Sequence, residues 1–325
     1  MLNRPRRNRK HPAIRAMVEE TVLRPSNLIY PLFLSNTSVE REAISSLPDL
    51  YRLNLDGIKR EIEICVELGL RTFVLFPVIP EELKDKTATY SYVEDNFYLK
   101  AIRSLKEQFP GIILMSDVAL DPYNSDGHDG IVKNGVILND ETLPVLGKMS
   151  VAQAQAGIDI IGPSDMMDGR VGYIREALDD NGFEHVSIMA YTAKYASAFY
   201  GPFRDALDSA PKSGDKKTYQ MNPANKKEAL REAELDEAEG ADFLMVKPAL
   251  AYLDVIHLLK ENSMLPIAAY NVSGEYAMLK AACMNGWLDY EKAMPEMLLS
   301  MKRAGADSIL TYFAKDFAEL YKRGF

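Results

Sequence analysis

The chain has 325 residues, 47% of them hydrophobic, and a formal net charge of -9. This is the composition of a globular protein large enough for a sizeable core, and the acidic charge argues against nucleic acid as the main partner. No apolar run approaches the roughly 20 residues that span a bilayer, and the two cysteines, Cys65 and Cys283, cannot form a disulfide framework, so we expect no membrane partner and a cytoplasmic location.

The first segment, residues 1–26, is basic and lacks the apolar stretch of a secretory signal. It begins MLNRPRRNRKHPAIR, with six Lys and Arg residues and no acid before Glu19. Three interpretations stay open: a disordered arm, an arm that docks on an acidic neighbouring subunit, or a transit peptide, which the two prolines and the lack of serine in that stretch disfavour. We expect an N-terminal arm over 1–26, serving oligomerisation, and one catalytic domain over 27–325.

Eight short apolar runs follow in chain order, with helical patterns between them. Each run is continuously apolar, as strands buried on both faces are. The runs cover residues 27–34, 71–78, 111–120, 158–164, 186–194, 241–249, 265–273 and 307–313. Residues 58–68 and 226–240 carry apolar side chains at helical spacing. The residues KNG at 133–135 predict a hairpin turn, followed by a helix that begins near Asn139 or Asp140.

A short pattern recurs where a helix meets a strand: ELGLRTFV, QAGIDII, EAEGADFLMV and RAGADSIL. Each helix ends on glycine, the residue that adopts the left-handed cap most easily, and a strand begins within two residues. Four copies of this joint indicate repeated βα units. We predict an α/β fold, a (β/α)8 TIM barrel with an extended N-terminal arm. The alternative, an open sheet that binds a dinucleotide, lacks the G-x-G-x-x-G fingerprint after a first strand.

Polar residues gather at the carboxyl ends of the predicted strands, where barrel enzymes place their active sites. Lys194 and Lys247 end the fifth and sixth strands, in YTAK and MVKP. Burial and a second nearby ammonium both lower the pKa of a lysine, and the resulting free amine can attack a carbonyl and form a Schiff base. For Lys247 alone, a structural lysine paired with a carboxylate stays open. The other candidates at strand ends are Asp117, Asp121, Asp126, Asp129, Ser164, Asp165, Ser273 and Tyr312.

A long loop, residues 195–225, follows the fifth strand. Long loops in compact domains are often lids, although a solvated charged loop is the alternative. Its cations suit a substrate carboxylate, and Arg204 is the preferred bidentate contact. The polar candidates on this loop are Arg204, Lys212, Lys216, Lys217 and Gln220.

Taken together, these segments resemble the porphobilinogen synthase family, also called 5-aminolevulinate dehydratase. The resemblance runs from about residue 27 to the C-terminus. It implies a lyase that condenses two molecules of 5-aminolevulinate into porphobilinogen, with loss of two waters, in tetrapyrrole synthesis. It rests on DVALDPYNSDGHDG, GPSDMMDGRV, MAYTAKYASAFYGPFRDA, LREAELDEAEGADFLMVKPALAYLD, AYNVSGEYAM and ILTYFA.

The resemblance also implies roles for the candidate residues. Lys247 would form the Schiff base with the first substrate, and Lys194 would hold the second. Ser273 and Tyr312 would bind the carboxylate of the first substrate. The carboxylate of the second would be bound by Arg204, Lys216 and Gln220. The residues implied to lie near the amino groups and the transferred protons are Asp117, Asp121, Asp129 and Ser164.

Metal binding differs among members of this family. Zinc-dependent members carry three cysteines where this chain has Ala119, Asp121 and Asp129. The resemblance therefore implies the aspartate-rich type, without a catalytic Zn²⁺, because no soft ligands remain. Asp121 and Asp129 either bind a hard or monovalent cation or act as proton carriers and ammonium partners, and we favour the second.

The resemblance further implies an allosteric Mg²⁺ at Glu232, with Asp165 and Arg170 as outer partners, and a homo-octamer whose N-terminal arms embrace neighbouring subunits. Three other functions stay open at this point. They are another class I aldolase-type Schiff-base barrel, a metal-dependent lyase without imine chemistry, and a non-catalytic binding barrel.

Overall fold

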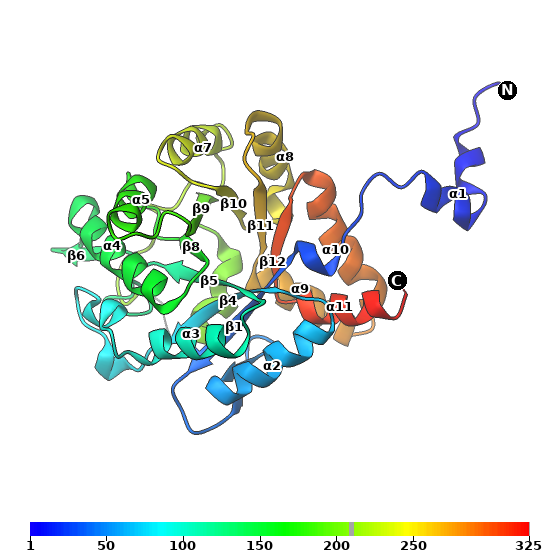
Figure 1. Ribbon diagram of the computed structural model, residues 1–325. Coiled ribbons are helices and arrows are strands. Elements are labelled where there is room, and N and C mark those ends of the chain that lie inside the picture. The colour runs from blue at the N-terminus through cyan, green and yellow to red at the C-terminus, as the bar shows by residue number, and fades with distance from the viewer. Residues whose placement is uncertain (208–210, 325) are drawn as a thin grey trace.

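A computed structural model describes residues 1–207 and 211–324 (Figure 1). Residues 208–210 of the predicted loop 195–225, and residue 325 of the predicted domain 27–325, lie outside the described residues. Eight parallel strands form a closed barrel, because β1 pairs with both β4 and β12. The predicted (β/α)8 TIM barrel is confirmed, and each predicted strand overlaps a barrel strand. These strands are β1 (Leu28–Ser35), β4 (Thr72–Val78), β5 (Ile113–Val118), β8 (Ile160–Pro163), β9 (Ser187–Lys194), β10 (Phe243–Lys247), β11 (Ile267–Asn271) and β12 (Ser308–Thr311).

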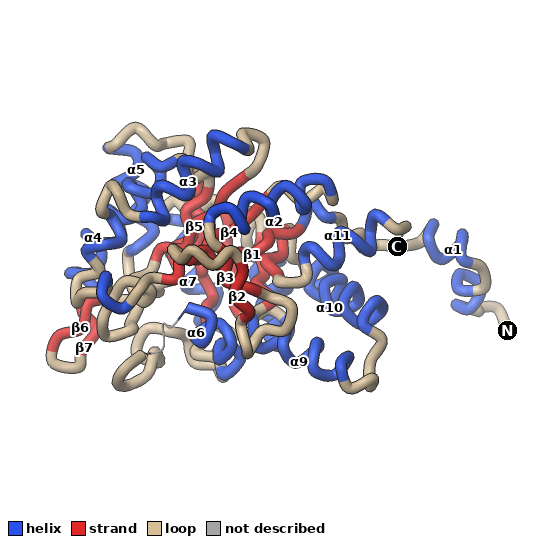
Figure 2. Tube along the Cα trace, turned by 90° about the horizontal axis from the view of Figure 1, so that it is seen from below, coloured by secondary structure: helices blue, strands red, loops and turns tan. Residues whose placement is uncertain are grey.

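Helices cover the outside of the barrel, as Figures 1 and 2 show. The predicted helices 58–68 and 226–240 correspond to α2 and α7. The helices after the arm are α2 (Leu55–Glu67), α3 (Phe97–Gln108), α4 (Asn139–Ala156), α5 (Arg170–Asp180), α6 (Gly201–Leu207), α7 (Glu228–Ala238), α8 (Leu253–Asn262), α9 (Ser273–Met284), α10 (Tyr290–Ala304) and α11 (Ala314–Lys322). Short 3-10 turns are η2 (Pro25–Asn27), η3 (Glu81–Leu83), η4 (Thr89–Tyr92), η5 (Ala198–Tyr200) and η6 (Leu250–Tyr252).

The four glycines of the recurring joint have the predicted conformation. Their φ angles are all positive, between 92° and 124°, which a side chain would strain. Three of the joints also carry an aspartate at the start of the next strand, and its carboxylate accepts a backbone N–H from the neighbouring strand. These three bonds join Asp159 to Leu114 at 2.8 Å, Asp242 to Ile188 at 2.7 Å and Asp307 to Ile267 at 2.9 Å. The amino-terminal end of the barrel is thereby tied together by side chains.

Two short pairs of strands extend from the barrel. β2 (Arg41–Ala43) pairs with β3 (Tyr51–Leu53), which continues the sheet beside β1. β6 (Ile131–Lys133) and β7 (Val136–Leu138) form the predicted hairpin, with Asn134 and Gly135 both at positive φ. The helix that follows begins at Asn139, but Leu138 is its cap residue and provides no side-chain hydrogen bond.

The N-terminal segment lies away from the barrel in both views (Figures 1 and 2). It contains η1 (Pro5–Arg9) and α1 (Pro12–Met17), and residues 1–20 are exposed except for the half-buried Ile14. In the described part of the chain, no helix combines the length and the apolar character that crossing a membrane requires.

Candidate active site

Two lysine side chains lie next to each other at the carboxyl ends of β9 and β10. The strand register places Lys194 opposite Lys247. Both are buried, with only 5% and 7% of their surface exposed. Residues at the same register of neighbouring strands project from the same face of a sheet. The barrel therefore brings the two amines together at the mouth where active sites form.

Aromatic rings surround the amine of Lys247. Burial, and to a lesser extent the charge of Lys194, lower its pKa from the ordinary value to about 7, against the opposing effect of Asp117 and two other aspartates. A lysine with this pKa is partly free amine near neutral pH, as a nucleophile must be. Its Nζ lies 4.6 Å from the ring centroid of Tyr270, 5.1 Å from those of Tyr200 and Phe203, and 5.2 Å from that of Tyr191.

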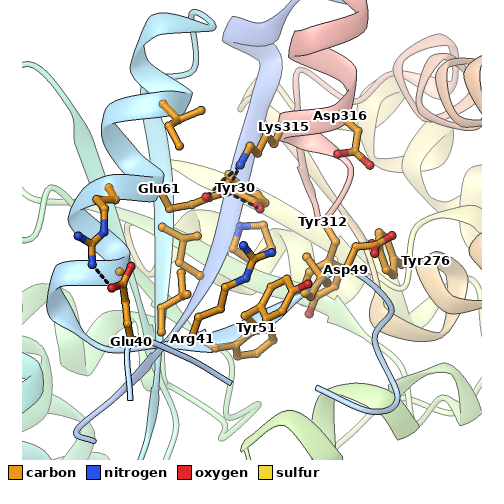
Figure 3. A pocket seen from close by; sticks show the side chains of 18 of the residues that line it. Tyr30, Glu40, Arg41, Asp49, Tyr51, Glu61, Tyr276, Tyr312, Lys315 and Asp316 are labelled. Atoms are coloured by element: carbon orange, nitrogen blue, oxygen red, sulfur yellow. Dashed lines mark hydrogen bonds and ion pairs between the residues drawn. The ribbon is translucent and has the colours of Figure 1, made fainter. Parts of the chain in front are cut away.

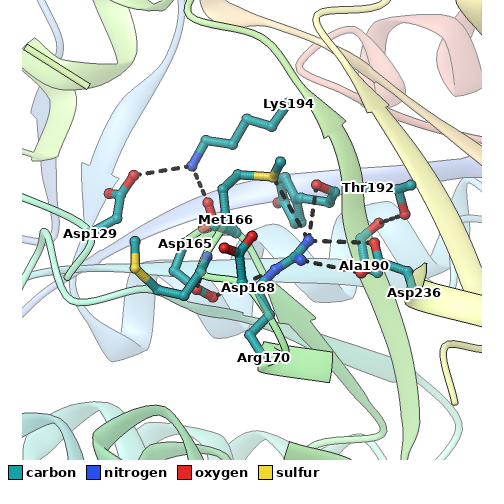
Figure 4. Close-up of polar contacts among 12 residues, drawn as sticks. Asp129, Asp165, Met166, Asp168, Arg170, Ala190, Thr192, Lys194 and Asp236 are labelled. Atoms are coloured by element: carbon teal, nitrogen blue, oxygen red, sulfur yellow. Dashed lines mark hydrogen bonds and ion pairs between the residues drawn. The ribbon is translucent and has the colours of Figure 1, made fainter. Parts of the chain in front are cut away.

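Lys194 differs because it has polar partners. Its Nζ donates to the backbone carbonyl of Ser164 and lies 3.5 Å from Oδ2 of Asp129 (Figure 4). Asp129 is fully buried. Burial acts to raise the pKa of Asp129, but Lys194 and Lys216 outweigh it and hold that pKa below its ordinary value. Asp129 is therefore ionised and fixes the position of Lys194.

The loop after β9 reaches into the site through Lys216. Its Nζ lies 2.8 Å from Oδ1 of Asp129 and 3.2 Å from Oδ2 of Asp121. Burial acts to lower the pKa of Lys216, but the two aspartates raise it above its ordinary value. Burial also raises the pKa of Asp121, and it raises that of Asp117 to about 6, against the opposing charges of lysines that include Lys247. The structure thus places Lys216 between two carboxylates.

Ser273 and Tyr312 are each linked to an aromatic residue that faces Lys247. The Oγ of Ser273 accepts a hydrogen bond from the backbone N–H of Phe203 at 3.0 Å, and the hydroxyl of Tyr312 lies 2.9 Å from that of Tyr270. Both residues are buried. Of the remaining candidates, Arg204 is half-buried on α6, directly after Phe203, and Gln220 is buried with its Oε1 lacking a partner among the described residues.

A second polar cluster lies behind Lys194 (Figure 4). Arg170 donates to Oδ1 of Asp236 at 3.2 Å, and its Nε lies 4.0 Å from Oδ2 of Asp165. That Oδ2 is buried and has no hydrogen-bond partner among the described residues. Burial raises the pKa of Asp165 to about 7 and that of half-buried Glu232 also to about 7, while Arg170 opposes both shifts. The sequence analysis missed Asp236, which is one of many acids on its helix.

Whether this cluster can bind a cation depends on how many protein ligands the cation needs. Across residues 1–207 and 211–324, no group of three or more His, Cys, Asp or Glu side chains is arranged to hold a metal ion. Mg²⁺ often keeps most of its waters and takes one or two carboxylates. A cavity of about 290 Å³ beside Glu232, lined by polar side chains including Asp168, Asn222, Asn225 and Glu228, has room for such a hydrated ion.

The loop over the site is held by a residue that the sequence analysis did not identify. The Nε2 of His128 lies 2.9 Å from the carbonyl of Ser213, and its Nδ1 lies 3.1 Å from the hydroxyl of Tyr219. Both partners belong to the loop after β9, whereas His128 follows β5. The segment SDGHDG contains His128, but no spacing in the sequence indicates that it contacts residues about 90 positions away.

A separate cavity of about 430 Å³ lies outside the barrel, between β1, α2 and α11 (Figure 3). Inside it, Lys315 and the hydroxyl of Tyr30 bond to Glu61 at 2.9 Å and 3.2 Å. Phe33 and Tyr312 line this cavity and pack against Phe203 and Tyr270, whose rings face Lys247. These aromatic side chains lie between the cavity and the two lysines, and Tyr312, a candidate active-site residue, borders the cavity.

Comparisons with known proteins show the family to which the chain is related. The family described as delta-aminolevulinic acid dehydratase matches residues 2–320. A chloroplastic delta-aminolevulinic acid dehydratase of Glycine max is 58% identical over 313 residues, which cover 96% of this chain and 76% of that protein. The corresponding Arabidopsis thaliana protein is 57% identical, over 96% of this chain and 73% of that protein.

A solved structure is also similar over nearly the whole chain. The delta-aminolevulinic acid dehydratase (porphobilinogen synthase) of Toxoplasma gondii, in complex with its reaction product porphobilinogen, superimposes with a TM-score of 0.97. It is 51% identical and covers 98% of this chain and 91% of that one. These matches favour a porphobilinogen-forming enzyme over the class I aldolase-type alternative.

The expected cytoplasmic location is wrong. The curated relatives from plants carry names that place them in the chloroplast, not in the cytoplasm. The expectation failed for a physical reason: free cysteines suit any reducing compartment and do not distinguish one from another.

Proposed function

The chain belongs to the delta-aminolevulinic acid dehydratase family, and from this premise we propose how the residues at its barrel mouth make porphobilinogen. The enzyme is a lyase of tetrapyrrole biosynthesis. It condenses two molecules of 5-aminolevulinate into one porphobilinogen and releases two waters. One observation carries the assignment of roles: Lys247 is a buried amine with a pKa of about 7, next to a second buried lysine.

In the proposed mechanism, Lys247 attacks the ketone of the first substrate. A bond forms between Nζ and the ketone carbon, and the ketone oxygen leaves as water. The protonated imine then withdraws electrons from the adjacent carbon and eases loss of its proton. Lys194 forms the corresponding imine with the second substrate. Holding both substrates on neighbouring strands makes bond formation between them effectively intramolecular, which is a large entropic advantage.

The carboxylates of the two substrates bind on opposite sides of this pair in our proposal. Ser273 and Tyr312 bind the first, a role supported by their contacts with two residues that face Lys247. The second carboxylate is bound by Arg204, Lys216 and Gln220. When the substrate binds, Lys216 gives up its contact with Asp121 and contacts the substrate carboxylate instead. The loop after β9, which carries Lys216, acts as the lid.

The aspartates serve as ammonium partners and proton carriers. The ion pairs of Asp129 with Lys194 and Lys216, and of Asp121 with Lys216, support this role over cation binding. Asp117, with a pKa raised to about 6, is suited to exchange protons near neutral pH. Ser164 completes this side of the site through its carbonyl bond to Lys194.

We further propose an allosteric Mg²⁺ held by Glu232 and water molecules, with Asp165 and Arg170 as outer partners. The raised pKa of Glu232 supports a cation at this place, and so does Oδ2 of Asp165, which accepts no hydrogen bond from the described residues. The ion would supply that charge and link α7 to the cluster behind Lys194. No catalytic Zn²⁺ is part of the proposal, and the assembly we propose is a homo-octamer whose arms, residues 1–26, embrace neighbouring subunits.

Product formation tests the function directly. The purified protein is incubated with 5-aminolevulinate, and substrate and product are quantified by mass spectrometry. We expect one porphobilinogen for every two substrate molecules consumed, and no product from the Lys247→Met variant. Native protein that is folded and consumes no 5-aminolevulinate with Mg²⁺ present would contradict the proposal.

A further inference from the structure

Glu275 is a buried carboxylate at the rear of the candidate active site. It lies in the first turn of α9, and only 1% of its surface is exposed. Its Oε2 accepts a hydrogen bond from the backbone N–H of Val272, the cap residue of the helix, at 3.0 Å. No ion pair with Glu275 is found in the described part of the chain. A buried carboxylate without a cation is costly, and its hydrogen bonds offset part of that cost.

Those hydrogen bonds come from the ends of different barrel strands. Oε1 accepts from the backbone N–H of Leu250, in the segment after β10, at 2.8 Å. Oε2 accepts from Nδ2 of Asn271, the last residue of β11, at 2.8 Å. The Oδ1 of Asn271 in turn accepts from the hydroxyl of Thr311, the last residue of β12, at 2.9 Å. One carboxylate thereby connects the ends of three successive strands.

Each connected strand end adjoins a residue assigned to the first substrate. Leu250 lies three positions after Lys247, Ser273 lies two positions before Glu275, and Tyr312 directly follows Thr311. The substrate is a keto acid, so its ketone must meet Nζ of Lys247 while its carboxylate lies at Ser273 and Tyr312. The spacing of these strand ends therefore decides how many carbons may separate the ketone from the carboxylate in a keto acid that binds here.

We propose that Glu275 is a positioning residue that sets the distance between Lys247 and the carboxylate-binding pair Ser273 and Tyr312. This inference rests on the proposed function. Glu275 itself touches no substrate: it acts through the backbone after β10 and through Asn271. A displacement of about 1 Å between reacting groups is enough to lower a rate by about a hundredfold.

The substitution Glu275→Gln separates this role from simple packing. Glutamine keeps the size of the side chain, but one of its terminal groups becomes an N–H donor. Every partner named above offers a hydrogen to the carboxylate, so an amide leaves one donor facing another. We expect the variant to lose the hydrogen bond between the side chain at position 275 and one strand end, and to keep its fold.

The experiment measures chain-length selectivity of imine formation at Lys247. Native protein and variants are incubated with 4-oxopentanoate, which is the substrate without its amino group, or with 5-oxohexanoate, which is one methylene longer. Borohydride then transfers a hydride to the imine carbon, and peptide mass spectrometry quantifies the amine formed. Acetone, a ketone without a carboxylate, reports the reactivity of Lys247 alone.

Native protein should strongly prefer 4-oxopentanoate. In Glu275→Gln the preference should fall about tenfold or more, while trapping of acetone changes little. The matched control is Asp159→Asn, in which a carboxylate that accepts a strand N–H is replaced at the opposite end of the barrel. It should keep the native preference.

Should Glu275→Gln not fold, Thr311→Val decides. It removes the hydroxyl that donates to Oδ1 of Asn271, together with the hydrogen bond that this hydroxyl accepts from the backbone N–H of Phe313. A reduced preference in Thr311→Val supports the proposal. If Glu275→Gln folds and keeps the native preference for 4-oxopentanoate, the proposal is overturned. If Glu275→Gln does not fold, a native preference in Thr311→Val overturns it. If native protein traps no ketone at Lys247, the proposed function fails, and the positioning role fails with it.

Discussion

The two lysines at the barrel mouth have the same residue type and register but different surroundings. Lys247 is enclosed by four aromatic rings, whereas Lys194 bonds to Asp129 and to the carbonyl of Ser164. Aromatic faces stabilise a cation less than a carboxylate does, so burial dominates at Lys247 and its pKa falls to about 7. This difference supports the proposed roles, with Lys247 as the first nucleophile and Lys194 held for the second substrate.

Replacing Lys194 with methionine should affect both turnover and the pH dependence of Lys247. The change removes a positive charge that lowers the pKa of Lys247, so that pKa should rise. Imine formation needs the free amine and therefore increases as pH rises through the pKa. Its midpoint, near pH 7 in native protein, should move to higher pH in Lys194→Met. Borohydride trapping of 4-oxopentanoate over a pH series measures it.

Porphobilinogen formation should be lost in the same variant, because the second substrate has no imine partner. Retained turnover would favour a mechanism with one lysine, as in a class I aldolase. An unchanged midpoint would contradict the assigned cause of the lowered pKa. Lys106→Met is the control, since Lys106 bonds to Asp159 at the other end of the barrel.

The residues at strand ends could be predicted from the sequence, but their surroundings could not. Lys194 and Lys247 each end an apolar run, so the barrel rule alone places them at the mouth. The rings around Lys247 come from β9, η5, α6 and β11, and only the folded chain brings these segments together. Glu275 did leave a signal: it stands three residues after the helix cap, where a glutamate typically bonds back to the cap.

At the scale of elements, the recurring joint performs two tasks. Its glycine ends the helix at positive φ, and in three of the four copies an aspartate accepts a backbone N–H from the neighbouring strand. The first task could be predicted, because only glycine adopts that conformation without strain. The second task could not be predicted, because an aspartate shortly after a glycine is equally typical of a solvated loop. The amino-terminal end of a barrel is where such stabilising contacts belong.

Asp159→Ala should destabilise the barrel without changing its chemistry. The change removes the acceptor of the Leu114 N–H and the partner of Lys106. A lost hydrogen bond from a buried strand N–H costs about 1–3 kcal/mol in the free energy of unfolding. Urea denaturation measures that loss, and activity per folded molecule should equal that of native protein. A large loss of activity in fully folded protein would contradict this separation between the two ends of the barrel.

At the scale of the whole molecule, our proposal assigns communication between subunits to the arm and to the Mg²⁺ site. Residues 1–20 are almost wholly exposed and carry most of the positive charge of the arm, while the chain as a whole is acidic. Exposed basic arms bind complementary acidic surfaces. The barrel could be predicted from the sequence because its pattern repeats, whereas the arm has no periodic pattern from which to predict its contacts.

Removal of magnesium should lower the activity of native protein, and added Mg²⁺ should restore it. In Glu232→Gln the response to Mg²⁺ should be weakened at least about tenfold in concentration, because the only carboxylate proposed to contact the ion is lost. Assays across a Mg²⁺ series after chelation measure this. Glu234→Gln, on the same helix, is the control and should respond as native protein does. Equal responses in all three proteins would contradict the proposed site.

Truncation of residues 1–20 should reduce the size of the assembly. If the arms embrace neighbouring subunits, their loss removes contacts from every subunit of the octamer. Sedimentation velocity should show an octamer for the native chain and a smaller species for the truncated one. An octamer that persists without the arm would contradict the proposed role of the arm.

The most direct test of the account is imine trapping with the substrate itself. Protein incubated with 5-aminolevulinate is treated with borohydride, and the added mass is mapped to a peptide. The account predicts a substrate adduct on Lys247, with Lys194 modified second or to a smaller extent. Folded, active protein that carries no adduct on either lysine would contradict the imine mechanism.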